Sequence, residues 1–177
     1  MAWLKRVSVV LAAAVVLIVV VPWVIGALMD REHVGQGAAV VAAPIEEVWT
    51  TVSAFDKTSQ WAPDFESVRR ASDVKGLPSY EVSGDGYSLT FTFTEVVPPE
   101  RLVAKLEDHA QNYGGEWTYE LSTVAGGTRI AITERGWTEP AYFRFMLWLF
   151  GYDTTIEGYL DGLQKKYGGE RASSTAS

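Results

Sequence analysis

Cysteine is absent from the 177-residue chain, which excludes disulfide bonds and metal sites built on thiolates. The motifs H-E-x-x-H and C-x-x-C are absent as well, and neither His33 nor His109 has an acid or nucleophile motif beside it. We therefore expect no bound metal, no cofactor and no catalytic residue that a motif would identify.

Positive charge is scarce. The chain has 15 Lys and Arg against 22 Asp and Glu, a formal net charge of −7. Lys5 and Arg6 are the only charged side chains before Asp30, so the rest of the chain is two units more negative than the whole. Contacts to phosphates need Lys and Arg, and no basic stripe is visible. We therefore expect no binding of nucleic acid.

No charged residue occurs between Val7 and Met29. At about 1.5 Å per residue this run is roughly 35 Å long as a helix, enough to cross a bilayer with modest tilt. The alternative is a cleaved signal peptide, but its apolar region is usually about 7–15 residues long and ends in an A-x-A pattern, which ALMDRE lacks. We therefore predict an uncleaved transmembrane anchor over residues 1–29, kinked at Pro22.

Charges at the two ends of this run predict its orientation. Lys5 and Arg6 precede it, whereas Asp30 and Arg31 follow it. Short flanking segments rich in Lys and Arg stay in the cytoplasm. We expect a single-pass membrane protein with a cytoplasmic N-terminus, a tether over residues 30–34 and an extracytoplasmic domain.

Residues 35–168 combine helical and strand periodicity. A strand around Gly35–Ala42 precedes two short helices over 44–55 and 56–61, the first opened by Pro44. After Pro63 the hydrophobic period changes to two. Strands are expected near residues 65–71, 79–83, 86–96, 101–108, 116–121 and 128–137, followed by a long helix over 140–167 and a disordered tail over 169–177.

This order predicts an α+β fold in which a curved antiparallel sheet of about seven strands wraps around one long C-terminal helix. A helix about 10 Å across is too narrow to fill the concave face of such a sheet. Either large side chains plug the remaining space or a cavity is left.

Five segments occur in a characteristic order: AAPIEEVW, SQWAPDFESV, PPERLVAKLE, GGTRIAIT and IEGYLDGLQK. In order and spacing they resemble the START-like helix-grip superfamily, also called SRPBCC, which includes polyketide cyclases, and in particular its small membrane-anchored bacterial members. The resemblance covers about residues 34–167 and implies a cavity between the sheet and the last helix. Members bind lipids, sterols, polyketides or hormones, and some catalyse cyclisation, so the fold does not settle the activity.

A helical wheel centred on Phe145 gives one continuous apolar face, which must meet the sheet, and Gly151 is the position where this helix could bend or be interrupted. Its aromatic residues are expected either to pack as core or to roof a ligand cavity opposite rings of the strands. The aromatic cavity candidates are Tyr142, Phe145, Trp148 and Tyr152 from the helix and Phe91, Phe93, Trp117 and Tyr119 from the strands.

Strand alternation also turns two carboxylates inward, Asp108 and Glu134. Buried carboxylates are costly unless paired, so such positions can be functional. The alternative is that both lie at strand ends near water. We add Glu134 to the cavity candidates.

The opposite face of the same helix carries Phe143, Leu147 and Phe150. Because the tether is short, the domain must sit close to the lipid, and we expect these three side chains to touch the bilayer. The alternatives are contact with residues 56–65 or with another copy of the chain; the oligomeric state is left open.

Three functions are compatible with this pattern. The first is a membrane-tethered module that binds a small hydrophobic or lipidic ligand. The second is an enzyme of the polyketide cyclase or hydrolase kind in the same cavity, and the third is a structural or partner-binding domain with a filled core. Cavity volume separates them, since ligand sites usually measure about 300–1,000 Å³ and a filled core leaves below about 100 Å³.

Overall fold

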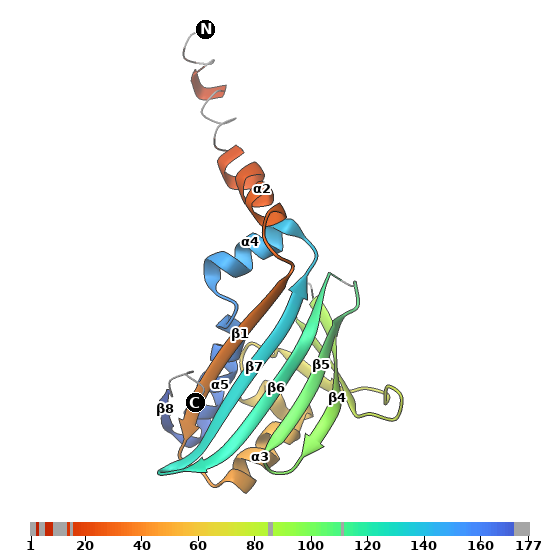
Figure 1. The fold of residues 1–177 in the computed structure, drawn as a ribbon, viewed down its shortest axis with the longest axis vertical. Helices are drawn as coiled ribbons and strands as arrows, with labels where there is room; N and C mark the ends of the chain where they lie inside the picture. The colour runs from red at the N-terminus through yellow and green to blue at the C-terminus, as the bar shows by residue number, and fades with distance from the viewer. Residues whose placement is uncertain are drawn as a thin grey trace.

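An eight-stranded antiparallel sheet forms the frame of the protein, as Figure 1 shows for the computed structural model. The structure describes residues 3, 6–8, 14, 16–84, 87–110 and 112–171. The strands are β1 (Glu32–Val41), β2 (Ser67–Arg70), β3 (Ser79–Gly84), β4 (Tyr87–Val97), β5 (Arg101–Asp108), β6 (Tyr113–Val124), β7 (Gly127–Thr138) and β8 (Gly169–Arg171).

The sheet order is β2-β3-β4-β5-β6-β7-β1-β8. Strands β2 to β7 therefore form the predicted meander, and β1 adds to β7 along its whole length, from Glu32 opposite Trp137 to Val41 opposite Thr128. The expected α+β class with an antiparallel sheet is confirmed. One strand is additional, because β8 pairs with β1 where the tail was expected to begin. The rest of that tail, 172–177, lies outside the described residues.

The helices after β1 are α3 (Ile45–Ser53) and the 3₁₀-helix η2 (Phe55–Gln60). Pro44 stands at the N-cap of α3 in an extended conformation. A proline before the first helical turn removes no helical hydrogen bond, because the donors of that turn have no partner within the helix.

The single long helix predicted over 140–167 is instead two helices, α4 (Ala141–Phe150) and α5 (Thr154–Tyr167). Gly151 ends α4 with φ 99° and ψ 144°, a conformation that is strained for any residue with a Cβ. The direction of the chain changes there, so α4 does not continue the apolar face of α5.

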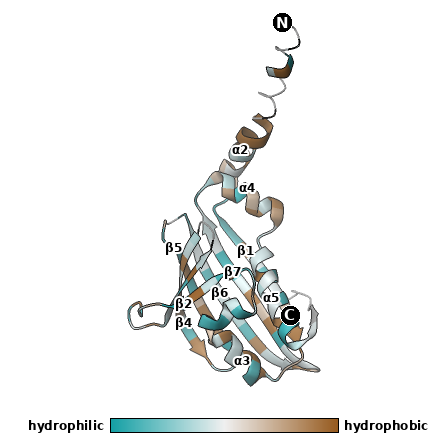
Figure 2. Cartoon of the chain, turned by 180° about the vertical axis from the view of Figure 1, so that it is seen from behind, coloured by the Kyte–Doolittle hydropathy of each residue, from teal (hydrophilic) through white to brown (hydrophobic). Residues whose placement is uncertain are grey.

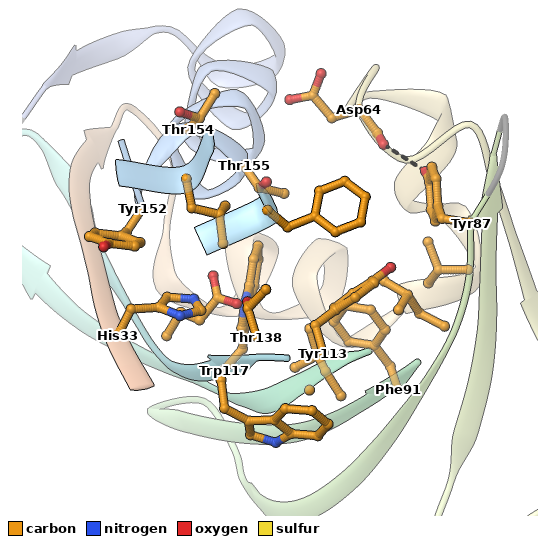
Figure 3. A pocket seen from close by; sticks show the side chains of 18 of the residues that line it. His33, Asp64, Tyr87, Phe91, Tyr113, Trp117, Thr138, Tyr152, Thr154 and Thr155 are labelled. Atoms are coloured by element: carbon orange, nitrogen blue, oxygen red, sulfur yellow. Dashed lines mark hydrogen bonds between the residues drawn. The ribbon is translucent and has the colours of Figure 1, made fainter. Parts of the chain in front are cut away.

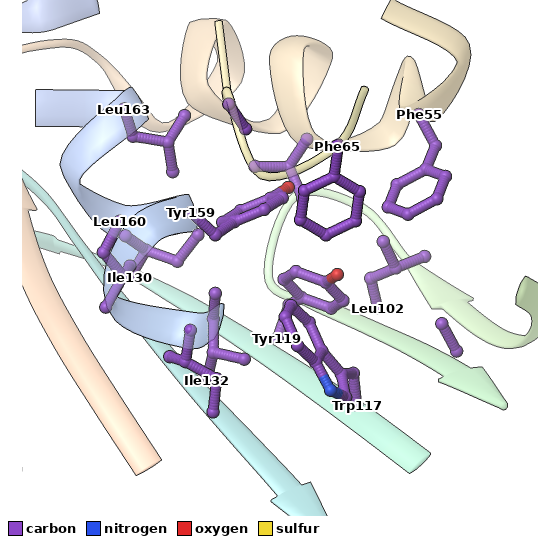
Figure 4. Packing of buried hydrophobic residues seen from close by; sticks show 14 of the residues in the cluster. Phe55, Phe65, Leu102, Trp117, Tyr119, Ile130, Ile132, Tyr159, Leu160 and Leu163 are labelled. Atoms are coloured by element: carbon purple, nitrogen blue, oxygen red, sulfur yellow. The ribbon is translucent and has the colours of Figure 1, made fainter. Parts of the chain in front are cut away.

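Of these two helices, α5 packs closely on the sheet. A Cβ at Gly37 on β1 would be 2.7 Å from Ile156 Cγ2 and 2.9 Å from a Leu160 methyl carbon, so the two elements touch closely. Figure 4 shows Tyr159 of α5 beside Tyr119 of the sheet and Phe65 of the preceding loop. These rings and their neighbours fill the space between α5 and the sheet completely, as their near-zero exposure indicates.

The N-terminal segment leaves the sheet at the end where α4 lies (Figure 1). It forms the π-helical segment η1 (Val16–Val20) and then α2 (Val21–Ala27), with Pro22 in the first turn of α2. Proline has no N–H to donate, which is why the hydrogen-bond pattern changes at this point. Among the described residues, no helix combines the length and apolar character needed to cross a membrane. The continuous transmembrane helix predicted over Val7–Met29 is thus not found, and residues 9–13 and 15 of that run lie outside the described residues.

The close packing of α5 predicts different effects for two glycines of that helix. A Cβ at Gly162 would lie 2.5 Å from the backbone oxygen of Trp61, whereas a Cβ at Gly158 would meet only the exposed carboxylate of Asp64, which can rotate away. Alanine favours a helix over glycine by about 1 kcal/mol at either site. We expect Gly162→Ala to lower the free energy of unfolding by about 1–3 kcal/mol, the usual cost of overpacking.

Gly158→Ala is the matched control and should change stability by no more than about 1 kcal/mol, in either direction. Urea unfolding of both variants followed by tryptophan fluorescence provides the comparison. Equal stability of the two variants would contradict the close packing of α5 on the loop at Trp61.

Candidate functional site

A partly enclosed pocket of about 400 Å³ lies between the sheet and α4, beside the well-packed core. Its floor consists of Phe91, Leu106 and Trp117, which come from three neighbouring strands. Figure 3 shows His33 and Tyr152 at one side of the pocket and Tyr87 at the other. The volume falls within the range of ligand-binding sites, about 300–1,000 Å³.

Strand pairing brings the floor residues together. Phe91 on β4 is directly opposite Leu106 on β5, and Trp117 on β6 is directly opposite Glu134 on β7. Side chains of directly paired residues project from the same face of a sheet. Across the inner face of the sheet, the side chains are therefore apolar as far as Trp117 on β6, and the next one, Glu134 on β7, is ionisable.

Glycine at position 136 makes room for the polar side of the pocket. A Cβ on Gly136 would lie 2.6 Å from His33 Nε2 and 3.4 Å from Glu134 Oε1, so both groups occupy the space that a side chain would take. The His33 ring also stacks on Tyr152, with ring centroids 5.0 Å apart and planes inclined by 17°. The pocket thus presents one imidazole and one carboxyl group side by side.

Burial changes the ionisation of both groups. It raises the pKa of Glu134 to about 7, although the nearby indole of Trp117 lowers it slightly. The indole Nε1–H has no hydrogen-bond partner of normal geometry among the described residues, so this opposing effect is weak. Burial lowers the pKa of His33 more than its hydrogen bond to the backbone of Arg31 raises it. Near neutral pH, the His33 imidazole is therefore mainly uncharged, and the Glu134 carboxyl group is present in both its protonated and its ionised form.

Tyrosine hydroxyls add polar atoms around the pocket. Burial, reinforced by the charge of Asp108, raises the pKa of Tyr113 to about 12, so this hydroxyl remains a donor at physiological pH. Across the pocket, the Tyr87 hydroxyl donates to the backbone oxygen of Asp64 at 3.2 Å (Figure 3). No group of three or more His, Asp or Glu side chains that could hold a metal ion occurs in the described part of the chain.

Four of the nine cavity candidates line the pocket: Phe91, Trp117, Glu134 and Tyr152. Phe93 and Tyr119 point to the same face of the sheet but belong to the filled core, where they contact Phe55 and Tyr159 respectively. Their strands were interpreted correctly, but the part of the concave face that α5 fills depends on where that helix lies.

The other three candidates, Tyr142, Phe145 and Trp148, do not line the pocket. Phe145 packs on Trp148 with ring centroids 5.8 Å apart, and 55% of Trp148 is exposed. We expected these residues to cover the cavity because we assumed one unbroken helix. The chain turns at Gly151, so α4 presents a different side to the sheet than α5 does. Phe143 and Leu147, which we assigned to membrane contact, border the pocket; Phe143 is also 55% exposed and Phe150 is 68% exposed, so the contact with lipid stays a prediction.

Sequence reasoning missed His33, which was placed in the tether. Strand β1 begins at Glu32, so only Asp30 and Arg31 of the expected tether precede it. Alternation continued two residues back from Gly35 turns His33 to the inner face. Asp108, the second inward carboxylate expected from alternation, lies outside the pocket lining and accepts a hydrogen bond from the backbone N–H of Asn112 at 2.9 Å.

Residues 34–163 match the family described as polyketide cyclase / dehydrase and lipid transport. The chain belongs to this family. The match covers β1 through most of α5 and therefore includes nearly all of the pocket. No curated protein matches the sequence.

Solved structures share the fold at low sequence identity. The ZhuI aromatase/cyclase from Streptomyces sp. R1128 has a TM-score of 0.64 and 12% identity, over 76% of this chain and 93% of that chain. The di-domain aromatase/cyclase StfQ from the steffimycin biosynthetic pathway has a TM-score of 0.62 and 13% identity, over 77% of this chain and 50% of that chain. A protein from Thermobifida fusca has a TM-score of 0.59 and 22% identity, over 76% and 93%.

The raised pKa of Glu134 predicts a pH dependence of stability. A carboxyl group whose pKa is higher in the folded state stabilises the fold below its unfolded value, 4.5, and this contribution is lost as the pH rises towards about 7. The Glu134→Gln variant keeps a neutral side chain at every pH. We expect the stability difference between wild type and variant to fall by up to about 3 kcal/mol between pH 4.5 and 7 and then to stay level.

Urea unfolding of both proteins from pH 4 to 8 measures this difference. His33 titrates in both proteins, so its own contribution largely cancels. A difference that does not change over this range would show that Glu134 is not desolvated.

Proposed function

We propose that the protein binds one small apolar or lipidic molecule in the pocket between the sheet and α4. The observation that carries this proposal is an unfilled volume of about 400 Å³ in direct contact with a core that is otherwise fully packed. A domain with a filled core, the third alternative, would leave no such space. Membership of a family named for polyketide cyclases and lipid transport supports the same conclusion.

The chemistry of the lining indicates the class of ligand. The floor rings of Phe91 and Trp117 and the aliphatic Leu89 and Leu106 offer apolar contact, which stabilises a complex by roughly 25 cal/mol for each Å² removed from water. Glu134 and His33 place two ionisable groups together at one side, whereas the Tyr87 hydroxyl across the pocket already donates to the backbone oxygen of Asp64. A molecule with an apolar body and one polar end, such as a carbonyl, hydroxyl or carboxyl group, matches this distribution.

Tethering to a membrane is the second part of the proposal. Its support is the run Val7–Met29, which contains no charged residue, and the positive charges of Lys5 and Arg6 before it. By the positive-inside rule the N-terminus would face the cytoplasm and the domain would be extracytoplasmic. A tethered domain would take up and release its ligand close to lipid.

A second candidate function is catalysis in the same pocket, of the polyketide cyclase or hydrolase kind. Glu134, with a pKa of about 7, and the uncharged His33 beside it have the ionisation states suited to acid–base catalysis at neutral pH. Two proteins of similar fold are aromatase/cyclases. We favour binding because the floor of the pocket is apolar, and Glu134 and His33 occupy one side of it.

Filling the pocket tests the binding proposal. Leu89 lines the pocket from β4, whereas its neighbour Thr90 projects from the other face of the strand. After incubation with a total bacterial lipid extract, the full-length protein should carry a bound molecule in native mass spectrometry. We expect the Leu89→Trp variant to lose most of this occupancy because the indole takes the space, and the Thr90→Trp control to retain it.

Equal occupancy in the two variants, or a wild-type protein that carries no bound molecule, would contradict the proposal. The same samples separate binding from catalysis. A bound molecule should be extracted with unchanged mass after prolonged incubation. A mass change that Glu134→Gln abolishes would instead identify the protein as an enzyme.

A further inference from the structure

Large apolar side chains are exposed together at the end of the molecule where α2 and α4 lie. Figure 2 shows these helices side by side, with hydrophobic colouring on both. Their most exposed residues range from 52% to 85% exposure, far above what is usual for such side chains in water. Six of them form what we call the helix-pair surface: Trp23, Val24 and Leu28 from the α2 end, and Trp148, Leu149 and Phe150 from α4. Phe143 of α4 is 55% exposed as well but borders the pocket.

The two helices present no charge to their surroundings. No charged residue occurs in η1 or α2, and the one charged residue of α4, Arg144, is only 9% exposed. A helix that faces water normally carries charged residues on its outer side. The composition of the helix pair therefore indicates an apolar partner.

Arg144 joins the two helices instead of facing solvent. Its Nε donates to the backbone oxygen of Gly26 at 2.8 Å, and Nη1 donates to the backbone oxygens of Thr138 at 3.1 Å and Glu139 at 2.5 Å. These bonds compensate the burial of the guanidinium and tie the end of β7, α4 and α2 together.

Glycine allows the helices to touch at the same point. A Cβ at Gly26 would lie 1.8 Å from the backbone oxygen of Ala141, so no other residue fits without moving α2 away from α4. The helix pair is thus held by backbone contact and by Arg144. The helix-pair surface is consequently one fixed surface and not a loose end.

The position of α2 within the uncharged run Val7–Met29 favours lipid as the partner of the helix-pair surface. The chain enters α2 directly from the uncharged run that begins at Val7, so whatever surrounds that run also reaches α2 and, through the Arg144 contacts, α4. Trp23 and Trp148 supply indole rings of the kind that sit at the interface between lipid and water. No Lys or Arg lies on the surface to attract anionic headgroups, so its attraction to lipid would be apolar and insensitive to salt.

We propose that the helix-pair surface lies in a lipid bilayer and holds the pocket against it. Phe143 and Leu147 of α4 border the pocket on the same helix that carries Trp148 and Phe150 outward. A ligand could therefore pass between lipid and pocket along α4 without crossing bulk water; this last step rests on the proposed ligand-binding function. Of the three residues expected from the sequence alone to touch the bilayer, Phe143 and Phe150 are exposed, at 55% and 68%, and Leu147 borders the pocket.

The absence of cysteine allows a direct test with single-cysteine variants of the full-length chain. Trp148→Cys and Phe150→Cys place a nitroxide label on the helix-pair surface. Ala125→Cys places it in the exposed β6–β7 turn, at the opposite end of β7 from α4. In phosphatidylcholine vesicles, electron paramagnetic resonance compares collisions of each label with oxygen, which concentrates in lipid, and with a water-soluble nickel chelate.

We expect the ratio of oxygen to nickel collisions to be several-fold higher at positions 148 and 150 than at 125. Equal ratios at all three positions would overturn the inference. Spin–spin broadening that disappears on dilution with unlabelled protein would overturn it as well, because it would show that a second copy covers the surface.

Ligand binding is measured separately in the Trp148→Ser/Phe150→Ser double variant. Neither residue lines the pocket, so native mass spectrometry from detergent should find the wild-type occupancy. Equal collision ratios at positions 148, 150 and 125, together with retained occupancy in the double variant, would refute only the membrane surface. A wild-type protein without ligand would refute only the binding function.

Discussion

The backbone turn at Gly151 is the constraint on which the pocket depends. With φ 99° and ψ 144°, it stops α4 and sends the chain towards α5 in a new direction. Had the helix continued, its aromatic face would have followed Ile156 and Tyr159 onto the sheet and closed the concave side along its whole length. Because α4 departs at this residue, part of that side stays open, and Trp148 and Phe150 face outward while Phe143 borders the pocket.

The filled half and the open half have complementary roles. Under α5, Tyr119 and Tyr159 are completely buried, and burial raises the pKa of both hydroxyls, which therefore stay neutral. Trp117 contacts both of these tyrosine rings and also forms part of the pocket floor. The floor is therefore rigid, and a ligand would meet a surface whose shape is set by the core beneath it. Glu134 lies at the border between the two halves, which explains its raised pKa.

Local patterns in the sequence were sufficient to predict β1 to β7, but not β8, and to identify the inner face of the sheet. Strict alternation placed Phe91, Trp117 and Glu134 correctly because the side-chain period of a strand does not depend on distant contacts. Recognition of the superfamily from short segments was confirmed by the match over residues 34–163. These features are determined within a few residues of the chain.

Features that depend on tertiary geometry were not accessible in this way. The chain turns at one glycine, so Trp148 faces outward, Phe145 lies outside the pocket lining, and Leu147 borders the pocket. His33 joined the site because β1 starts earlier than its hydrophobic pattern indicates. Because α5 covers Tyr119, that residue belongs to the core, whereas Trp117 lies at the edge of α5 and also borders the pocket. Of these outcomes only the break in the helix has a local signal, which is Gly151 itself, and a glycine within a helical pattern does not determine the direction of the chain after it.

An experimental structure of the full-length protein purified with its lipid tests the central claim most directly. The account predicts continuous density for an apolar molecule on Trp117 and Phe91, with its polar end at Glu134 and with α4 turned away from the sheet at Gly151. A structure in which α4 and α5 form one helix, with the rings of α4 packed into the space above Trp117, would contradict it.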